Sequence, residues 1–585
     1  MFNNKIILAA SLSAIFLSNS ANAVIGPIKI SLNTEYRTSN PVIGEIATTI
    51  KLDKSDIEDT GATTFTGLLQ SIPSVSFEGG QGNLRALRIR GNEASHTLLL
   101  LDGNQVSITG GQPNLDVIPL DQIERIEITK GPFSSLYGPG AIGGVIHIFT
   151  DKDVNSITSS KIDISSGSNG TTKTNLNTYF KNDKSYIDIA LTDFETDGID
   201  AKGDGDLDPI DRKTLGLNFG TKLTDLTDIN VNILNTKANI YYDNGNYAVK
   251  PDNNLSQMNV GVSHKYGKRS QINLDLMRQN TQRMGDKYKL NTYTLINETD
   301  FDFSKLSLGF TTTDDKDLSN AKNIKHTDIF TQWQGLIIDN EVSFGSRFID
   351  HDKFSSHITY NFNWAKDLSP TTRVNASYGS ATNLPSHFQN KKNLEHGQTS
   401  LKPERSKNIE LGLKNDLEKV DIEFKIYKSK VEDSFDYHYL NYIDYDGYYF
   451  NNQTVDITGA EFSLNTELLG WDLNTNLDFN KSIDRATKKQ RGRRPNRSIS
   501  VNLLKSSGKW KRNINWTAKS SAWDGQTETT KLGGYGLLNL STSYDFTEDL
   551  SVYLNRNNVL DKNYEMAKGY NTHGKTTTIG LIYNF

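Results

Sequence analysis

Hydrophobic and polar residues alternate along most of the chain. At the C-terminus, one set of alternate positions holds Phe585, Tyr583, Leu581, Ile579 and Thr577, and segments 538–546 and 422–426 follow the same pattern. A period of two is that of a β-strand with unlike faces. Similar segments recur from about residue 160 onwards between Asp-, Asn- and Gly-rich connections, and helical periodicity is scarce there. The pattern predicts a long antiparallel meander, which must close to remove its edges.

The first 152 residues have a different pattern. Residues 64–75 predict a short helix with Thr64 near its start, ending before Pro73. Segments 84–91, 96–103 and 123–131 predict short strands, and the unbroken apolar run 97–101 indicates a strand buried on both faces. We therefore expect a small α+β domain before the meander.

Composition narrows the protein class only in part. A secretory signal peptide over 1–23 is predicted from Lys5, an apolar run over 6–18 and Ala21-Asn22-Ala23. We therefore expect the mature chain to start at Val24. The chain has no cysteine, so its fold cannot rest on disulfides or thiolate chemistry. Hydrophobic residues make up 35% and the net charge is −5. A membrane β-barrel keeps its average hydropathy low, so these values suit both such a barrel and a soluble secreted β-protein.

Several short motifs decide between these two classes. In the N-terminal part they are 89–91 (IRG), 101–103 (LDG), 123–127 (IERIE), 130–132 (KGP), 135–138 (SLYG) and 141–146 (AIGGVI). Further on they are 401–404 (LKPE), 459–461 (GAE), 558–564 (NVLDKNY) and the terminal phenylalanine. The series resembles the TonB-dependent outer-membrane receptors.

The resemblance implies an all-β transmembrane barrel of about 22 antiparallel strands, with an N-terminal α+β plug domain in its lumen. It divides the chain into an N-terminal segment (24–40), the plug (41–152) and the barrel (153–585). The roughly 433 residues after 152 allow about 20 per strand, enough for a membrane strand of about 9–11 residues and its connection. In such a plug, the glycine-rich stretch 131–150 would lie where the domain folds back tightly and its last strand approaches the barrel wall.

The resemblance also implies coupling to a TonB-type periplasmic protein. The segment in the position of the TonB box consists of Ile28, Lys29, Ile30, Ser31, Leu32, Asn33 and Thr34. Its alternation suits pairing by strand addition. It lacks the family's acidic start and Val-Val core, and the alternative is an ordinary first strand of the plug.

Four charged residues of the plug are expected to lock it to the barrel in the manner of the family. They are Arg90, Arg125, Glu127 and Lys130. The alternative is that they are ordinary charges on the surface of the plug.

Within the family, segment 79–103 is most similar to the plug of cobalamin transporters, including Asn92, Ala94, Ser95 and His96. This likeness implies import of a cobalamin across the bacterial outer membrane by a monomer surrounded by outer-membrane lipid, with no nucleic-acid partner. The expected ligand contacts, from two apical loops of the plug, are Asn83, Leu84, Gln112 and Asn114. An equally good interpretation is that these four residues only form the turns of the loops.

An acidic stretch over 196–214 holds five aspartates within twelve residues. Calcium takes six to eight oxygen ligands, many of them carboxylates, and the resemblance implies that calcium orders such loops. The calcium ligands it implies are Asp200, Asp206, Asp208 and Asp243. A solvated acidic loop is the alternative.

Other functions remain open at this stage. Heme or a ferric siderophore is the rival ligand: His396 lies in a predicted loop over 390–401, although 383–386 does not carry the FRAP motif of heme receptors. A passive porin or adhesin would not require the plug motifs. We find no Gly-x-Ser-x-Gly or His-Glu-x-x-His motif for a secreted enzyme, and we expect neither enzymatic activity nor a redox cofactor.

Overall fold

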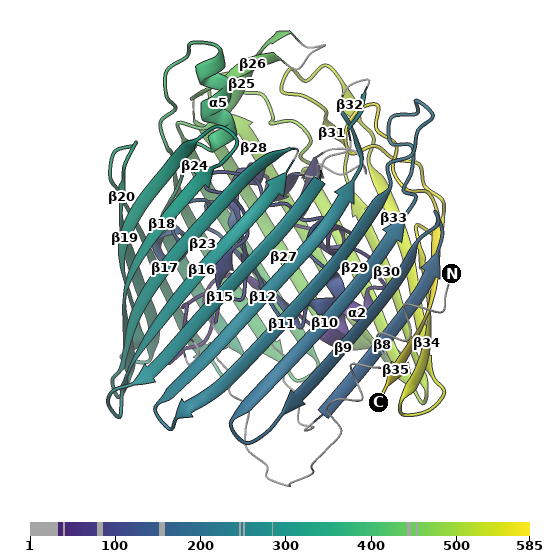
Figure 1. The fold of residues 1–585 in the computed structure, drawn as a ribbon, viewed down its shortest axis with the longest axis horizontal. Coiled ribbons are helices and arrows are strands. Elements are labelled where there is room, and N and C mark those ends of the chain that lie inside the picture. The colour runs from purple at the N-terminus through teal and green to yellow at the C-terminus, as the bar shows by residue number, and fades with distance from the viewer. Residues whose placement is uncertain are drawn as a thin grey trace.

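The computed structural model describes residues 33–38, 41–78, 86–150, 158–244, 247–249, 252–283, 285–441, 446–451 and 454–585. Its largest element is a closed antiparallel barrel that surrounds a small domain built from the N-terminal part of the chain (Figure 1). The barrel contains 22 strands, and β8 closes it against β35. The predicted fold class is therefore confirmed.

The barrel strands follow one another around the wall in chain order. They are β8 (Thr158–Gly167), β9 (Thr172–Lys181), β10 (Ser185–Thr196), β11 (Ile210–Thr224), β12 (Thr227–Ile240), β15 (Asp252–Lys265), β16 (Ser270–Arg283), β17 (Asp286–Asp300), β18 (Ser304–Asp317), β19 (Lys322–Ile337), β20 (Asn340–His351), β21 (His357–Ser369), β22 (Thr372–Asn383), β23 (Glu404–Leu417), β24 (Val420–Glu432), β27 (Val455–Leu468), β28 (Trp471–Asp484), β29 (Arg497–Ser507), β30 (Trp510–Lys519), β33 (Tyr535–Asp545), β34 (Leu550–Asn557) and β35 (Thr576–Asn584).

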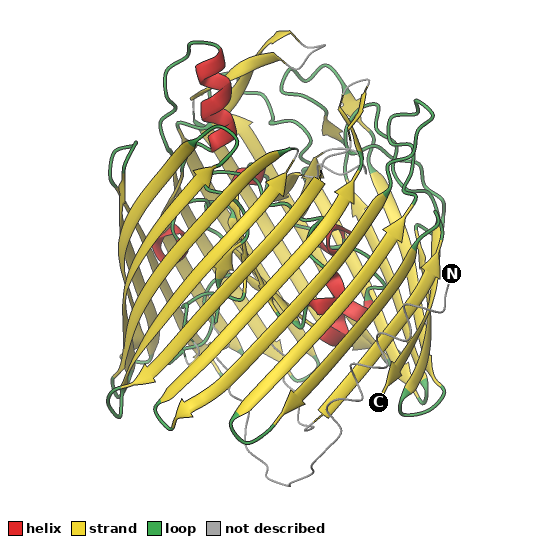
Figure 2. Cartoon of the chain, in the orientation of Figure 1, coloured by secondary structure: helices red, strands yellow, loops and turns green. Residues whose placement is uncertain are grey.

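The two ends of the barrel differ in their connections (Figure 2). At one end neighbouring strands are joined by tight turns such as 225–226, 338–339 and 418–419. At the other end many of the connections are long, and three of these form hairpins. These are β13 (Tyr242–Asn244) with β14 (Tyr247–Val249), β25 (Phe435–Asn441) with β26 (Asp446–Asn451), and β31 (Ala522–Trp523) with β32 (Lys531–Leu532). Outer-membrane barrels have short periplasmic turns and longer extracellular loops, so we call the long-loop end the outer end.

One long connection contains a helix that the alternating pattern did not predict. Residues 387–395 form α5 (His387–Glu395), where the sequence indicated a loop. Ser386 and Gln389 form a capping box, in which each side chain accepts a hydrogen bond from the other residue's backbone N–H. This local motif stabilises a first helical turn without an apolar face.

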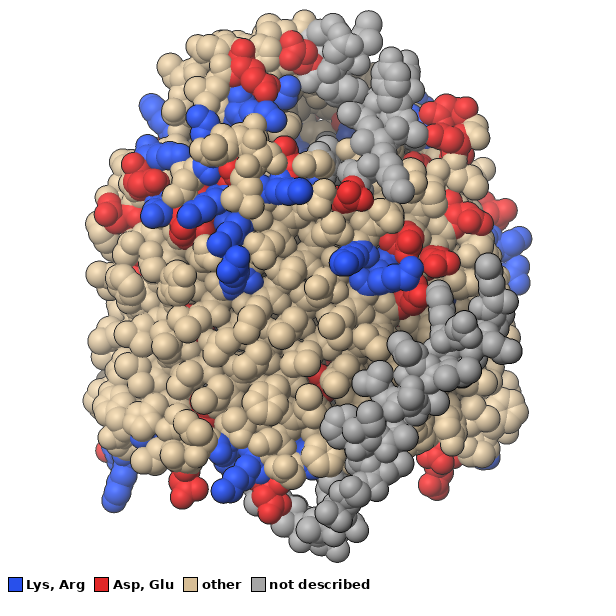
Figure 3. Space-filling model, in the orientation of Figure 1, with Lys and Arg blue, Asp and Glu red and all other residues tan. Residues whose placement is uncertain are grey.

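Alternate side chains of each strand face outwards and inwards. On β35 the outward Ile579, Leu581 and Tyr583 are exposed, whereas Thr578 is buried. On the face shown in Figure 3, charged side chains gather towards the two ends of the barrel and leave a nearly uncharged band between them. This is the arrangement expected of a barrel that crosses a membrane. No helix among the described residues is long and apolar enough to span a bilayer.

The inner domain, the plug, contains a five-stranded sheet in the order β1-β6-β7-β4-β5 and a separate pair of β2 with β3. Its strands are β1 (Thr49–Asp53), β2 (Val75–Glu78), β3 (Ala86–Ile89), β4 (Thr97–Leu101), β5 (Asn104–Gln105), β6 (Arg125–Lys130) and β7 (Gly144–Phe149). Its helices are α2 (Lys54–Asp59), α3 (Phe65–Gln70) and α4 (Ser134–Tyr137), with 3₁₀ turns at Ala94–His96 and Leu120–Gln122.

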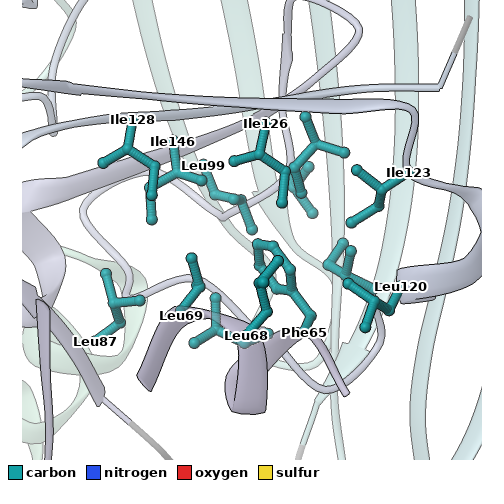
Figure 4. Packing of buried hydrophobic residues seen from close by; sticks show 14 of the residues in the cluster. Phe65, Leu68, Leu69, Leu87, Leu99, Leu120, Ile123, Ile126, Ile128 and Ile146 are labelled. Atoms are coloured by element: carbon teal, nitrogen blue, oxygen red, sulfur yellow. The ribbon is translucent and has the colours of Figure 1, made fainter. Parts of the chain in front are cut away.

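The plug has its own apolar core between α3 and the sheet (Figure 4). Phe65, Leu68 and Leu69 of α3 face Leu99 of β4 and isoleucines of β6 and β7. The hydroxyl of Thr64 caps α3 by accepting the N–H of Gly67 at 3.1 Å, as the sequence predicted. All five residues of β4 are buried, which confirms the two-sided burial of this strand.

The glycine-rich stretch approaches the barrel before its strand begins. Gly140 has φ +97° and donates its N–H to the carbonyl of Thr382 on β22 at 2.9 Å. An L side chain rarely adopts this backbone conformation. β7 lies between β6 and β4 in the plug sheet, and its end also meets the wall as expected, because Asn218 of β11 donates its side-chain amide to the Thr150 carbonyl at 3.3 Å.

Candidate functional site

The N-terminal segment is described only from Asn33 onwards, so Ile28, Lys29, Ile30, Ser31 and Leu32 lie outside the described residues. Asn33 forms an antiparallel bridge with Thr38 and donates its side-chain amide to Glu45 at 2.7 Å. These contacts fold residues 33–38 into a tight turn against the plug.

Thr34 connects this turn to the centre of the plug sheet. Gly103 donates its N–H to Nε2 of His147 at 2.8 Å, which leaves the ring proton on Nδ1. Nδ1 lies 3.1 Å from the Thr34 hydroxyl, which donates to Glu127 at 2.5 Å. Burial lowers the pKa of His147 well below its ordinary value, so the ring is neutral. The chain of hydrogen bonds joins the N-terminal turn to β6 and β7.

Arg90 and Lys130 form a buried charge cluster with two glutamates of the barrel wall. Arg90 lies 2.5 Å from Glu410 of β23 and 2.8 Å from Glu461 of β27, and Lys130 lies 3.1 Å from the same Glu461. The Arg90 guanidinium also stacks on Tyr427, 4.2 Å from the ring centroid. Two plug cations thus face two barrel carboxylates, and these four residues are called the lock cluster below.

Arg125 and Glu127 lie elsewhere. They pair with each other at 3.0 Å, and Arg125 stacks on Phe149 of the plug at 3.9 Å. On β6 they alternate with Lys130, so they face the other side of the sheet. The structure therefore splits the four predicted lock residues into two pairs.

Of the four predicted ligand contacts, Asn83 and Leu84 lie outside the described residues. Gln112 and Asn114 are half-buried against the barrel wall. The carbonyl of Gln112 accepts from Arg283 at 2.9 Å, and the Asn114 amide donates to Asn253 at 3.4 Å. The loop that carries them is fixed to the wall rather than free in the lumen.

The same apical loop contacts the beginning of α5. Thr109 donates its N–H to Asp315 of β18 at 2.7 Å, and Asp315 lies 3.4 Å from His387. Gly110 has φ +65°, and a Cβ there would come within 2.0 Å of the Leu384 carbonyl. The plug and an outer loop therefore meet without a gap at this point.

The acidic loop is partly organised. Asp200, Asp204 and Asp206 bring carboxylate oxygens within 4.8 Å of one another. Asp208 is buried and accepts the N–H of Ala201 at 3.2 Å. Asp243 belongs to β13, but its side chain lies outside the described residues. The structure thus groups two of the four predicted calcium ligands with Asp204, which the motif comparison did not select.

An arginine-rich loop was missed by the sequence analysis. Arg491 and Arg494, between β28 and β29, are buried and lie 2.8 and 2.6 Å from Glu93 of the plug. Burial alone would raise the pKa of Glu93, but Arg494 and Arg491 hold it well below its usual value. The signal was present as four arginines within 490–497 (QRGRRPNR).

Arg491 also reaches the outer hairpin β25–β26, because it lies 3.3 Å from Asp436. The hairpin presents aromatic rings: Tyr437 lies 4.8 Å from both Tyr439 and Tyr449. His396, the candidate heme ligand, caps α5 and lies 3.0 Å from Asp446. Plug, arginine loop and hairpin are therefore joined through one side chain, Arg491.

Comparison with known proteins gives a consistent result. The model of the TonB-dependent receptor-like β-barrel matches residues 152–559, and that of the TonB-dependent receptor plug domain matches 44–145. The mutant ferric enterobactin receptor PfeA of Pseudomonas aeruginosa is 16% identical, with a TM-score of 0.79 over 92% of this chain and 98% of that chain. The siderophore receptor PirA of Acinetobacter baumannii is 17% identical, with a TM-score of 0.77 over 92% and 98%. The copper transporter OprC is 15% identical, with a TM-score of 0.79 over 92% and 99%. At these identities the solved structures show a shared fold.

Proposed function

This chain belongs to the family of TonB-dependent receptors, and we propose that it imports a metal chelate of the ferric-siderophore class across the outer membrane. The family consists of outer-membrane import receptors rather than enzymes. The solved structures named above are receptors for ferric enterobactin or siderophores and a transporter of copper. These relatives favour a ferric siderophore or a copper ligand over cobalamin, which the plug motifs had suggested.

The position of Arg491 is the observation that carries the proposal. Its guanidinium contacts Glu93 of the plug and Asp436 of the outer hairpin. A ligand that moves the hairpin changes the surroundings of Arg491 and, through Glu93, the plug. Binding outside is thereby connected to the domain that must move inside.

The chemistry around Arg491 suits an anionic, aromatic chelate. Tyr437, Tyr439 and Tyr449 offer ring edges and faces, which pack well against aromatic groups. The loop over 490–497 adds Arg491, Arg493 and Arg494, and guanidinium groups pair with oxyanions through fork-shaped geometry. A ferric catecholate combines aromatic rings with negative charge.

Coupling to a periplasmic TonB-type protein would start at the N-terminal segment. Tension on residues before Asn33 would act first on the Thr34 hydroxyl and its bond to Glu127. Since Glu127 belongs to β6 of the plug sheet, the pull would reach the strand that also carries Lys130.

Calcium is a further part of the proposal. The carboxylates of Asp200, Asp204 and Asp206 have the oxygen chemistry that calcium prefers. Asp200 accepts N–H groups of Asp204 and Gly205 at 3.1 and 2.9 Å, so part of its bonding capacity is already used. The hydrogen bond with Asp204 raises the pKa of Asp206, as expected for crowded carboxylates without a cation.

Equilibrium binding to the purified barrel tests the ligand class. We would measure tryptophan fluorescence with ferric enterobactin, ferrichrome, heme and cyanocobalamin, each with and without 2 mM calcium. The proposal expects ferric enterobactin to bind most tightly and Arg491→Gln to weaken it by about tenfold or more. Arg497→Gln, an exposed cation at the start of β29, is the matched control. If cyanocobalamin bound most tightly, cobalamin would replace the ferric siderophore as the proposed ligand.

Uptake by cells tests the coupling separately. Deletion of residues 28–32 should abolish accumulation of the radiolabelled chelate while leaving surface binding unchanged. Equal accumulation with and without this segment would contradict energy-coupled import.

A further inference from the structure

The outward face of the barrel carries a concentrated group of cations at the outer ends of β23, β24, β27 and β28. Residues with outward parity alternate there with buried inward neighbours. The cations are Arg405, Lys407, Lys428, Lys430, Lys481 and Arg485, which are called the basic rim patch. Three acidic residues accompany them: Glu432, Asp433 and Asp456.

Half of these cations already have carboxylate partners. Arg405 pairs with Asp433 at 2.8 Å, Lys430 pairs with Glu432, and Arg485 pairs with Asp456. Within the described part of the chain, Lys407, Lys428 and Lys481 form no ion pair and no side-chain hydrogen bond, and all three are exposed. The patch therefore keeps an excess of three positive charges.

The strand register brings these lysines together. Lys407 lies directly opposite Lys430, and Lys428 and Lys481 both lie opposite Thr458. Like charges directly opposite one another destabilise a sheet unless an anion stands between them. With strands about 4.8 Å apart, Lys428 and Lys481 are separated by about two strand spacings. A single multiply charged anion can contact all of them.

The patch stands at the boundary of the apolar outer surface. The next outward residue below Lys407 is Ile409, that below Lys428 is Ile426, and that below Lys481 is Phe479. These three apolar side chains are exposed by 50, 44 and 47% in the isolated chain, as expected of residues that face lipid tails. The lysines therefore lie at the level of the lipid head groups of the outer leaflet, one outward-facing position along each strand from the residues that face the hydrocarbon.

We propose that the basic rim patch binds a phosphorylated lipid head group, with Lys407, Lys428 and Lys481 on its phosphates. The ligand is held by two complementary surfaces: its acyl chains lie along Ile409, Ile426 and Phe479, and its phosphates neutralise the lysines. Basic clusters beside a membrane surface are attracted to the head groups of anionic lipids. The site is separate from the lumen and does not depend on the identity of the imported ligand.

Native mass spectrometry of the detergent-purified full chain tests this proposal. The probes are diphosphorylated lipid A, the same lipid with both phosphates removed, and inorganic phosphate. The expected result is retention of the diphosphorylated lipid at least about tenfold above the dephosphorylated form, with no competition from millimolar inorganic phosphate. Equal retention of both lipids, or full competition by free phosphate, would overturn the proposal.

Variants locate the site. The triple change Lys407→Gln, Lys428→Gln and Lys481→Gln should remove this preference, whereas the corresponding Lys→Arg triple should keep it. Lys184→Gln, Lys268→Gln and Lys419→Gln, exposed in turns at the opposite end, should leave it unchanged. Heat-dependent gel mobility confirms that each barrel is folded. A folded glutamine triple that retains the lipid as the wild type does would exclude the patch.

Discussion

Two of the groups of ion pairs that join plug and barrel differ in their access to water. In the lock cluster, Arg90 and its partners Glu410 and Glu461 are exposed by 3, 5 and 9%. On the α2 side, Lys511 pairs with Asp59 at 2.8 Å and Lys161 pairs with Glu58 at 2.7 Å. Their side chains are exposed by 35 and 11%, and by 26 and 44%.

Cavities account for this difference. A cavity of ≈ 420 Å³ lies between α2 and the wall formed by β8, β9, β30, β33, β34 and β35. A second, of ≈ 210 Å³, continues along α3 towards the outer loops. A third, of ≈ 410 Å³, extends from Asp59 to Lys130 and Glu461, so water reaches one flank of the lock cluster. The α2 side is therefore the wet side, where water can replace a lost contact, and we expect the plug to loosen there first.

Replacing Arg90 gives the largest expected effect. Arg90→Met leaves Glu410 and Glu461 buried without their principal partner, which costs about 3–5 kcal/mol. We would measure the free energy of opening of the β3 amides by hydrogen exchange. The corresponding Lys511→Met on the wet side should cost at most about 1 kcal/mol.

Equal losses for the two substitutions would remove the distinction between the sides. Arg90→Lys is an intermediate test, since it keeps the charge but not the two hydrogen bonds to Glu461, which measure 3.0 and 2.8 Å. Arg90→Lys should lower the free energy of opening of the β3 amides by less than Arg90→Met does, because a lysine cannot form the paired hydrogen bonds of a guanidinium.

The contact between the apical loop and α5 gives the next largest effect. Gly110→Ala combines a positive φ with a Cβ only 2.0 Å from the Leu384 carbonyl. We expect a loss of about 3 kcal/mol, of which about 1 reflects backbone conformation alone. Gly285→Ala is the control, because φ there is +83° and nothing lies within 4 Å of the added Cβ. Thermal unfolding of both variants would separate the cost of the backbone conformation from the cost of the steric clash. Equal losses would mean that the loop shifts to relieve the clash.

A pH effect should appear at the N-terminal turn. Burial raises the pKa of Glu35 from 4.5 to about 8, against hydrogen bonds from the backbone of Ala47 and Ile46 that lower it. A raised pKa in the folded state means that stability is complete below pH 4.5 and is lost as the pH rises to about 8. The hydrogen-exchange protection factors of residues 41–50, corrected for the intrinsic pH dependence of amide exchange, should therefore fall between pH 6 and 8.5. Glu35→Gln should abolish this dependence, and an unchanged slope in that variant would assign the effect to another group.

The sequence predicted those parts of the molecule that depend on local pattern. Alternation predicted a closed antiparallel sheet, the family resemblance implied its 22 strands, Thr64 marked the start of α3, and the run 97–101 marked a buried strand. The lock cluster could not be found in this way, because Arg90 meets Glu410 and Glu461 across separations of 320 and 371 residues. No local pattern encodes such a distance, and only the order of strands around the wall determines which carboxylates face the plug.

Two other differences have local causes. The helix α5 has no apolar face, so periodicity missed it although its capping box was visible at 386–389. Arg125 and Glu127 were grouped with Lys130 and Arg90 on the family resemblance alone. Residues of opposite parity on one strand face opposite sides, and this alone separates them.

The smallest expected effect concerns the wet side, where Lys161→Met should destabilise the plug by at most about 1 kcal/mol. Its partner Glu58 is exposed by 44%, so salt and water already compete for this ion pair. Raising the ionic strength from 0.05 to 1 M shortens the Debye length to about 3 Å and should erase the difference between Lys161→Met and the wild type. The effect of Arg90→Met should survive the same salt, because its carboxylates are out of reach of mobile ions. Hydrogen exchange of α2 and β3 amides at both ionic strengths measures the two responses in one experiment. A salt-sensitive lock cluster would mean that mobile ions, and not only water, reach its carboxylates through the third cavity, and that the two sides do not differ.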